Sequence, residues 1–323
     1  MKSADSIYPI FVRKNNSSRA FKAGFIDFEG QEVIKPEFED ARPFGWDRAS
    51  VKLDGKWGAI DHKGNLKILP LSDGPIRISE DRGIFQANGR RGIVDLGGST
   101  ILKPKYEFLS EFHEGAAWMG IGGLYGFVAP DGQEMMPPLY EDVRSFSEGL
   151  APVKLGNEWG YISKQLELVI PLQFESALPF SEGLARAQLN GKWGYIDKKG
   201  QFVIAPHFEA AREFHEGRAD VKLDNKWGYI DPEGNVVIQP TFRYTHEFSC
   251  GLAAVEPYGS LGRKMGFINA SGAFEVPPQF QEVAIFRRGL CFVVLAEDLA
   301  YIDQTGAIVW KAPYVEIRRI SLL

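Results

Sequence analysis

Features that mark several common functional classes are missing from this sequence. Its 323 residues include only two cysteines, Cys250 and Cys291, which is too few for a disulfide framework. No apolar run approaches the roughly 18 residues of a membrane-spanning helix, and the first eighteen residues lack the apolar stretch of a signal peptide. The net charge of −5 has the wrong sign for a general binder of nucleic acid or anionic membranes. We therefore expect a cytoplasmic protein that binds neither nucleic acid nor membranes.

Motifs that carry catalysis or hold a cofactor are missing as well. There is no Gly-x-Ser-x-Gly phrase, no phosphate loop and no dinucleotide fingerprint. The five histidines never stand in the His-x-x-x-His spacing of a helical zinc site, and there is no Cys-x-x-Cys pair. Cys291 has no histidine nearby in sequence that could activate it. We predict a protein that is not an enzyme and that holds no cofactor or metal.

The sequence is instead dominated by an internal repeat of about 34 residues. The phrase Lys192-Trp193-Gly194-Tyr195-Ile196-Asp197 returns as residues 226–231, and in altered form as residues 56–61 and 158–163. Its glycine anchors nine copies, in which the last has alanine: Gly24, Gly58, Gly92, Gly126, Gly160, Gly194, Gly228, Gly266 and Ala300. Every spacing is 34 residues except the 38 between Gly228 and Gly266. We treat residues 1–323 as one array of these copies.

One copy has the pattern of a three-stranded β-meander. In the sixth copy, residues 184–189 and 192–197 read as strands joined by Asn190-Gly191, a strong signal for a two-residue hairpin. Asp197 and Gly200 then frame a turn before a third strand at 201–204, which Pro206 ends. A recurring aspartate three residues after the anchor could belong to a calcium ladder, but its distance from the following glycine favours a turn cap.

The phrase Gly191 to Pro206, followed by Phe214 to Ala219, resembles the signature of the WG-repeat family. The resemblance extends from about residue 8 to about 315, although the family's tryptophan is absent from several copies, among them those with Ala23, Arg91 and Leu299. It implies a bacterial tandem array that mediates binding. The tryptophans read as core residues, with stacking platforms for sugars or bases as the alternative.

A meander this small cannot bury enough apolar surface to be stable alone, so the copies must stack on one another. Two arrangements fit an all-β chain of this kind: an open superhelical array of sheets, or a closed ring that resembles a β-propeller. Nine copies exceed the usual four to eight propeller blades, and each is short for a blade. We favour the open array and keep the ring as the alternative.

The first strand of each copy has one uniform and one variable set of side chains, and the variable set is our hypothesis for a binding face. Simple exposure of that face is the competing interpretation. A four-residue excess in the eighth copy falls at a hairpin tip, Tyr258 to Leu261, which is a second hypothesis for a contact. The candidate partner-binding residues are Trp118, Arg186, Arg218, Asp220, Tyr258 and Phe292.

These observations favour a protein-binding scaffold. The most specific hypothesis is a cytoplasmic immunity or sequestering protein for a basic toxin or effector, because no catalytic domain accompanies the repeats and the chain is mildly acidic. A carbohydrate- or cell-surface-binding module is the alternative, which exposed tryptophans would favour.

Overall fold

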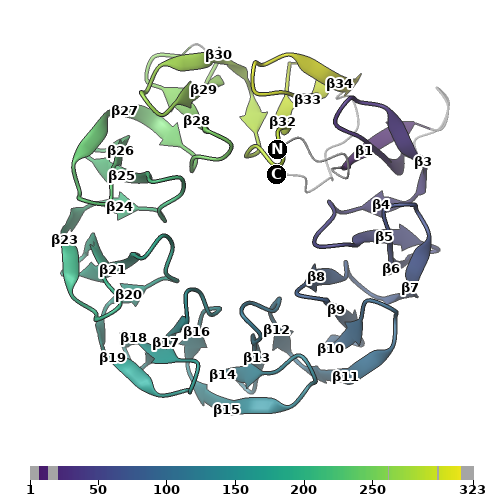
Figure 1. The fold of residues 1–323 in the computed structure, drawn as a ribbon, viewed down its shortest axis with the longest axis horizontal. Coiled ribbons are helices and arrows are strands. Elements are labelled where there is room, and N and C mark those ends of the chain that lie inside the picture. The colour runs from purple at the N-terminus through teal and green to yellow at the C-terminus, as the bar shows by residue number, and fades with distance from the viewer. Residues whose placement is uncertain (1–6, 14–20, 261, 297, 314–323) are drawn as a thin grey trace. The chain divides into compact units, whose positions relative to one another are not determined.

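The structure, a computed structural model, describes residues 7–13, 21–260, 262–296 and 298–313. These residues form strands, turns and bends, with no helix among them, and therefore none that could span a membrane. The chain divides into an N-terminal unit, Ala4–Leu168, and a C-terminal unit, Met1–Ser3 with Val169–Leu323. Residues 1–6, which the signal-peptide argument used, and Leu261 of the predicted tip lie outside the described residues. The all-β class is confirmed (Figure 1).

The N-terminal unit holds strands β1 to β18, grouped in sheets whose neighbours follow chain order. The first three sheets contain β1 (Tyr8–Arg13), β2 (Phe21–Ile26) and β3 (Glu32–Phe38); β4 (Asp40–Ala41), β5 (Ala49–Leu53), β6 (Lys56–Ile60) and β7 (Leu66–Ser72); and β8 (Arg77–Ser79), β9 (Arg82–Ala87), β10 (Arg90–Asp95) and β11 (Thr100–Tyr106). Next come β12 (Phe108–Leu109), β13 (Ala117–Ile121), β14 (Leu124–Val128) and β15 (Glu134–Tyr140), then β16 (Asp142–Val143), β17 (Leu150–Leu155) and β18 (Glu158–Ser163).

The C-terminal unit contains nearly all of β19 (Leu168–Phe174) and the remaining strands. A four-stranded sheet contains β20 (Ser176–Ala177), β21 (Ala185–Leu189), β22 (Lys192–Ile196) and β23 (Phe202–Phe208). A seven-stranded sheet contains β24 (Ala210–Ala211), β25 (Ala219–Leu223), β26 (Lys226–Ile230), β27 (Val236–Thr245), β28 (Leu252–Pro257), β29 (Met265–Asn269) and β30 (Phe274–Phe280). The last sheet contains β31 (Glu282–Val283), β32 (Cys291–Val294), β33 (Asp298–Ile302) and β34 (Ile308–Pro313).

The hairpin turn predicted at Asn190-Gly191 is confirmed, and three other copies have the same turn. Asn190 and Gly191 have φ of 52° and 71°, and Asp224 and Asn225 have 48° and 62°, the left-handed values that a type I′ turn requires. Asp54-Gly55 and Asn88-Gly89 behave in the same way. The local sequence therefore fixes the register between the first two long strands of these copies.

The glycine of the repeated phrase lies beside an irregularity in the third strand. In the second copy, the register between β6 and β7 shifts between Trp57 and Ala59. A Cβ atom built on Gly58 would lie 2.5 Å from the carbonyl oxygen of Ile68, closer than real Cβ contacts come. Glycine recurs here because the bulged backbone of the neighbouring strand occupies the space of a side chain.

The three-stranded meander is confirmed with one addition, because the connector contributes a short fourth strand in most copies. In the second sheet, Asp40 and Ala41 pair with Lys52 and Val51 of β5. Two residues give too little periodicity for the sequence to reveal such a strand.

The hydrophobic core lies between consecutive sheets as well as within them. One buried cluster joins Tyr195 and Ile204 of the β20–β23 sheet to Ala211, Val221 and Ile230 of the next sheet. Both faces of the central strands are therefore covered, which explains why stacking, and not the single meander, stabilises the fold.

Candidate functional site

The tryptophans of the repeated phrase pack beneath arginine side chains. The guanidinium carbon of Arg42 lies 5.0 Å from the ring centre of Trp57, and Arg144 lies 4.8 Å from Trp159. Trp57 and Trp159 are each only 5% exposed. A cation over an aromatic face adds a stabilising contact to the apolar packing. The prediction that these two tryptophans are core residues is confirmed, and their covered faces are not free to stack on a ligand.

The recurring aspartates cap turns. Oδ1 of Asp61 accepts hydrogen bonds of 2.9 Å from the backbone N–H groups of Lys63 and Asn65. Although burial alone would raise its pKa, the hydrogen bonds from Asn65 and Lys63 lower the pKa of Asp61 to about 2. The turn-cap interpretation is confirmed at this position. Among the described residues, no three His, Cys, Asp or Glu side chains gather in a way that could hold a metal ion.

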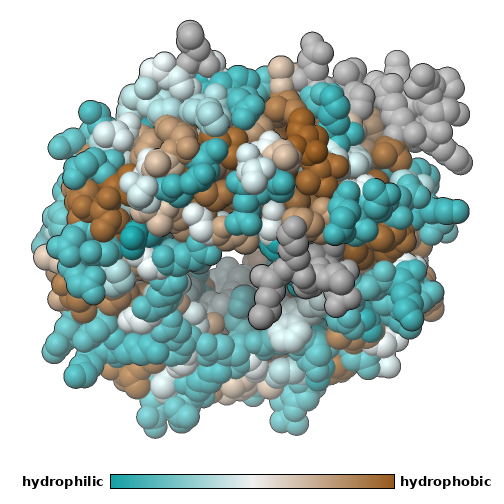
Figure 2. All heavy atoms as spheres, turned by 45° about the horizontal axis from the view of Figure 1, so that its top comes forward, coloured by the Kyte–Doolittle hydropathy of each residue, from teal (hydrophilic) through white to brown (hydrophobic). Residues whose placement is uncertain are grey.

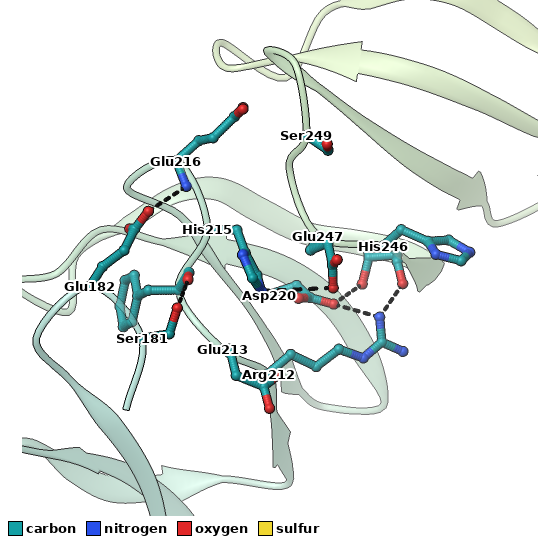
Figure 3. A network of polar contacts seen from close by, with 12 residues as sticks. Ser181, Glu182, Arg212, Glu213, His215, Glu216, Asp220, His246, Glu247 and Ser249 are labelled. Carbon is teal, nitrogen blue, oxygen red and sulfur yellow. Dashed lines mark hydrogen bonds and ion pairs between the residues drawn. The ribbon is translucent and has the colours of Figure 1, made fainter. Parts of the chain in front are cut away.

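A second recurring acid links several copies to the copy that follows. The Glu182 carboxylate accepts hydrogen bonds of 2.7 and 2.9 Å from the backbone N–H groups of Glu216 and Gly217, 34 and 35 residues further on. Figure 3 shows the bond from Glu216 to Glu182. Glu216 in turn accepts a bond of 2.8 Å from the N–H of Gly251. We call this series the glutamate ladder. The glutamates of the ladder have positive φ, 53° at Glu182, which is an unfavourable backbone conformation for residues other than glycine. The hydrogen bonds of the ladder hold the turns in this conformation.

A buried polar network joins β25 to the end of β27. Nη1 of Arg212 donates to Oδ2 of Asp220 at 2.9 Å and to the carbonyl oxygen of Thr245. The Thr245 hydroxyl donates to the same Asp220 oxygen at 2.7 Å (Figure 3). Burial raises the pKa of Asp220, against the opposing effects of Arg212 and Thr245. The Asp220 side chain is only 1% exposed, so its carboxylate is closed to solvent and the network holds parts of the fold together.

Two tyrosines extend this network along the chain. The Tyr229 hydroxyl donates to the carbonyl oxygen of His246 at 2.8 Å, and the Tyr195 hydroxyl donates to that of Arg212 at 2.7 Å. Burial, together with the charge of Arg212, lowers the pKa of His246 to about 4. His246 is therefore neutral at physiological pH, and its neighbours resemble a structural site more than a catalytic one.

The structure corrects the predicted binding face. Asp220 and Phe292 are buried, 1% and 8% exposed, so the prediction that they contact a partner from an open face is wrong. Phe292 packs edge-on against Tyr301, with ring centres 5.4 Å apart. Both side chains lie in the packed core and not on an open face.

The other predicted residues are more accessible but already engaged. Trp118 and Arg186 are half-buried; Arg186 donates to the carbonyl oxygen of Ala211 and pairs with Glu213 at 2.7 Å. Arg218, also half-buried, donates to the carbonyl oxygen of Gly217. Tyr258 is 50% exposed at the enlarged tip, as expected, although its hydroxyl donates to the carbonyl oxygen of Asn225. The structure does not gather these residues into one site.

An exposed aliphatic series on the third strands escaped the sequence analysis. Nine residues after the anchor, side chains that are 36–53% exposed recur in five copies: Val33, Met135, Val169, Val203 and Val237. The signal was present as a column of aliphatic residues, but such residues read as core. On the face shown in Figure 2, hydrophobic side chains form separate patches among hydrophilic ones. We call these five residues the outer aliphatic series.

The cysteines fit a structural role. Cys291 is fully buried, and burial raises the pKa of its thiol. Cys250 is half-buried and stands where the glutamate ladder has its acid. A high thiol pKa disfavours the thiolate that a nucleophile requires.

Comparison with protein-family models identifies the repeated unit. The model described as "WG containing repeat" matches seven stretches, which together cover more than half of the chain: residues 24–57, 92–125, 125–159, 159–193, 193–227, 227–256 and 265–296. The second and ninth of the nine copies expected from spacing have no match of their own. The comparison with curated proteins finds no match.

Solved structures share the fold at low sequence identity. The chain is similar to a crystal structure of the eukaryotic initiation factor, with a TM-score of 0.66, 12% identity, and coverage of 94% of this chain and 95% of that one. AztD from Citrobacter koseri matches with a TM-score of 0.47 and 11% identity over 90% of this chain and 91% of that chain. The structural neighbours are β-propeller-like proteins, the arrangement that the sequence kept as its alternative. At these identities the likeness concerns the fold alone.

Proposed function

We propose that this chain, which belongs to the WG containing repeat family, is a non-catalytic scaffold that binds a protein partner. The observation that carries the proposal is the outer aliphatic series. In the C-terminal unit, Val169, Val203 and Val237 are 46%, 53% and 37% exposed at the same position of successive copies. Exposed apolar patches mark surfaces that meet another protein, and this series supplies one exposed aliphatic side chain from each of three successive copies.

The surrounding backbone favours side-chain contacts over strand addition. β19 and β23 each end a four-stranded sheet, and they contain Pro171 and Pro206. Proline lacks the N–H that an added strand would need, so it protects a sheet edge against non-specific pairing. A partner would bind the aliphatic side chains of such an edge without extending the sheet.

Carbohydrate binding remains the second candidate function, with narrower support. Sugar sites use flat aromatic rings with a free face, whereas Arg42 and Arg144 cover the rings of Trp57 and Trp159. Trp46 is the observation in its favour, because it is 61% exposed at a connector turn. One exposed tryptophan gives a smaller platform than the aliphatic series gives for protein.

A basic toxin or effector remains our most specific proposal for the partner, with the protein acting in the bacterial cytoplasm. The net charge of −5 would attract a basic partner over long range. The first-strand residues Asp220 and Phe292 no longer belong to the proposed contact surface, because they are buried. The outer aliphatic series takes their place.

The test is capture of a partner from native lysate by the full-length chain, followed by reconstitution with the purified partner. We expect the double variant Val169→Lys, Val203→Lys to weaken binding at least tenfold, and the control Leu155→Lys, at an exposed strand end, to leave it unchanged. A partner that is unaffected by the double variant would remove the proposed surface. Retention of a glycan with no protein partner would replace the function itself.

For the immunity proposal, the partner is expressed with and without this chain in bacteria. Relief of growth arrest by the chain, lost in the double variant, is expected. A partner that is harmless when expressed alone would remove the immunity role and leave the scaffold.

A further inference from the structure

In the third sheet, β8–β11, two arginines face one cavity. At the corresponding place in other sheets, an arginine side chain packs on a tryptophan ring. Arg91 occupies the tryptophan position of the repeated phrase. Its backbone is paired with Gln86 of β9, and Arg77 of β8 is paired with Ile84 of the same strand. Since residues two apart on a strand share a face, Arg77, Ile84, Gln86 and Arg91 lie on the same side of the sheet.

Replacement of the tryptophan leaves a hollow. A cavity of about 220 Å³ opens there, lined by Gly74, Pro75, Arg77, Ile84, Phe85, Gln86 and Arg91. In the sheets that contain Trp57 and Trp159, the indole ring beneath Arg42 or Arg144 fills the corresponding position. Arg91 thus leaves open part of the space that an indole ring would fill. It also places a second guanidinium group beside this space.

The charges around this cavity are unbalanced. Arg77 is held in place by a hydrogen bond to the carbonyl oxygen of Leu109, and Arg91 lies 5.4 Å from the ring centre of Phe108. Burial, and then repulsion from Arg91, lower the pKa of Arg77, which Glu111 partly opposes. Arg91 forms no ion pair or hydrogen bond with any side chain that the structure describes. The other nearby acids, Glu107 and Asp73, pair with Arg90 and Lys56.

We propose that this cavity is a binding site for a carboxylate carried on a short aliphatic arm. The carboxylate would accept hydrogen bonds from Arg77 and Arg91, since a guanidinium presents paired N–H donors that match its two oxygens. Gln86 supplies an amide on the same wall, and its Oε1 lies 3.6 Å from the position of a Cβ on Gly74. Ile84 is buried, 2% exposed, and supplies an apolar part of the wall against the arm.

The size of the cavity sets the size of the ligand group. Sites for whole drug-sized molecules measure roughly 300–1,000 Å³, so about 220 Å³ suits one short chain end. A small free dicarboxylate and an acidic side chain of a partner protein both present this chemistry. A free phosphate offers the charge without the aliphatic arm.

Calorimetric titration of the full-length chain with three probes at constant ionic strength tests the proposal. The probes are glutarate, the blocked amino acid N-acetylglutamate amide, and inorganic phosphate. We expect saturable binding of at least one carboxylate probe, tighter than that of phosphate. Stronger binding of glutarate indicates a free dicarboxylate, and stronger binding of the amide indicates an acidic side chain. Binding of phosphate alone, or of no probe, overturns the proposal.

The decisive variant is Arg91→Trp, which restores the residue that other copies carry. It should fill the cavity beneath Arg77, reduce carboxylate binding at least tenfold, and leave the thermal midpoint equal or higher. Arg90→Leu is the matched control, because it removes one positive charge next to the site from a side chain that pairs with Glu107 outside the cavity. Equal binding by Arg91→Trp and the unaltered chain would show that the cavity is not the site. The readout concerns a small probe, so its outcome is independent of whether a protein partner exists.

Discussion

Two sheets of the N-terminal unit use the same backbone position in opposite ways. In the sheet that contains β16 to β18, Arg144 lies over Trp159, which is 5% exposed. In the β8–β11 sheet, Arg91 replaces the tryptophan and a cavity opens beside Arg77. Both sheets keep the same meander, with neighbouring strands in chain order. The contrast teaches that the tryptophan stabilises a copy without being needed to form it, so a copy that loses it is free to acquire a site.

The largest effect on stability should come from removing a tryptophan side chain that fills its position in the core. Trp159→Ala should lower the free energy of unfolding by about 3–5 kcal/mol, because it leaves a cavity in a packed interface. Arg91→Ala should cost less than about 1 kcal/mol, because the cavity already exists there. Urea unfolding of both variants measures the difference. Trp193, which is half-buried, should fall between them. Equal losses for Trp159 and Arg91 would contradict the comparison.

The second prediction concerns Arg212 and the seventh copy. This copy has both a tryptophan and a buried acid, Asp220. Asp220→Ala should cost about 3 kcal/mol, since it leaves Arg212 without its buried partner. Charge reversal at Asp220 should therefore unfold or destabilise the chain. Asp220→Asn, which keeps the shape and an acceptor for Thr245, is the control and should cost less. Thermal unfolding gives both values, and an unchanged midpoint in Asp220→Ala would remove the structural role.

The third prediction is that the free energy of unfolding depends on pH through His246, a dependence that the third sheet should lack. Burial depresses the pKa of His246 from its usual 6.5 to about 4 in the folded chain. A depressed pKa means that the unfolded chain binds the proton more readily, so stability is lost as the pH falls from about 6.5 towards 4. The loss should be about 2 kcal/mol, after allowance for partial exposure. Asp220 faces the same network with a raised pKa, which acts in the opposite direction.

His246→Gln isolates this effect. The difference in unfolding free energy between the unaltered chain and this variant should shrink or change sign between pH 7 and pH 4.5. A difference that is constant over this range would show that His246 titrates normally in the folded chain.

The smallest effect should come from the glutamate ladder. Glu182→Gln should cost about 1 kcal/mol, because charge-assisted hydrogen bonds to Glu216 and Gly217 become neutral ones. Glu182→Gly should cost a similar amount even though it relieves the positive φ, because it removes the bonds entirely. Amide hydrogen exchange at Glu216 and Gly217 should increase in both variants. Unchanged exchange would mean that the ladder is not what fixes these turns.

Local features of the fold were predictable because their causes are local. Asn190-Gly191 forms its hairpin through backbone conformations that few other residue pairs adopt, and Asp61 caps its turn through residues two and four positions away. The all-β class followed from these signals. The short fourth strand did not, because two residues carry no period.

Contacts between copies were not predictable from one sequence. Asp220 looked like an exposed variable residue, yet its partners are Arg212, eight residues earlier, and Thr245, 25 residues later. Variation that is compensated by a neighbour cannot be told from freedom without knowing which residues meet. The cavity at Arg91 was missed for the same reason, since loss of the tryptophan was visible but Arg77 was not visible as its neighbour.

The glutamate ladder also constrains how such a chain can lengthen. Each acid serves the turn of the following copy, so Glu80 bonds to Gly115, and Glu182 to Gly217, at the same separation of 35 residues. A gene duplication that inserts any whole multiple of 34 codons within this region therefore gives every acid a receiving turn, wherever the breakpoints fall. An insertion of another length separates one acid from its turn. Cys250 supplies no carboxylate, and the 38-residue spacing overlaps the same part of the chain. The constraint on the length of an insertion therefore does not extend past Cys250.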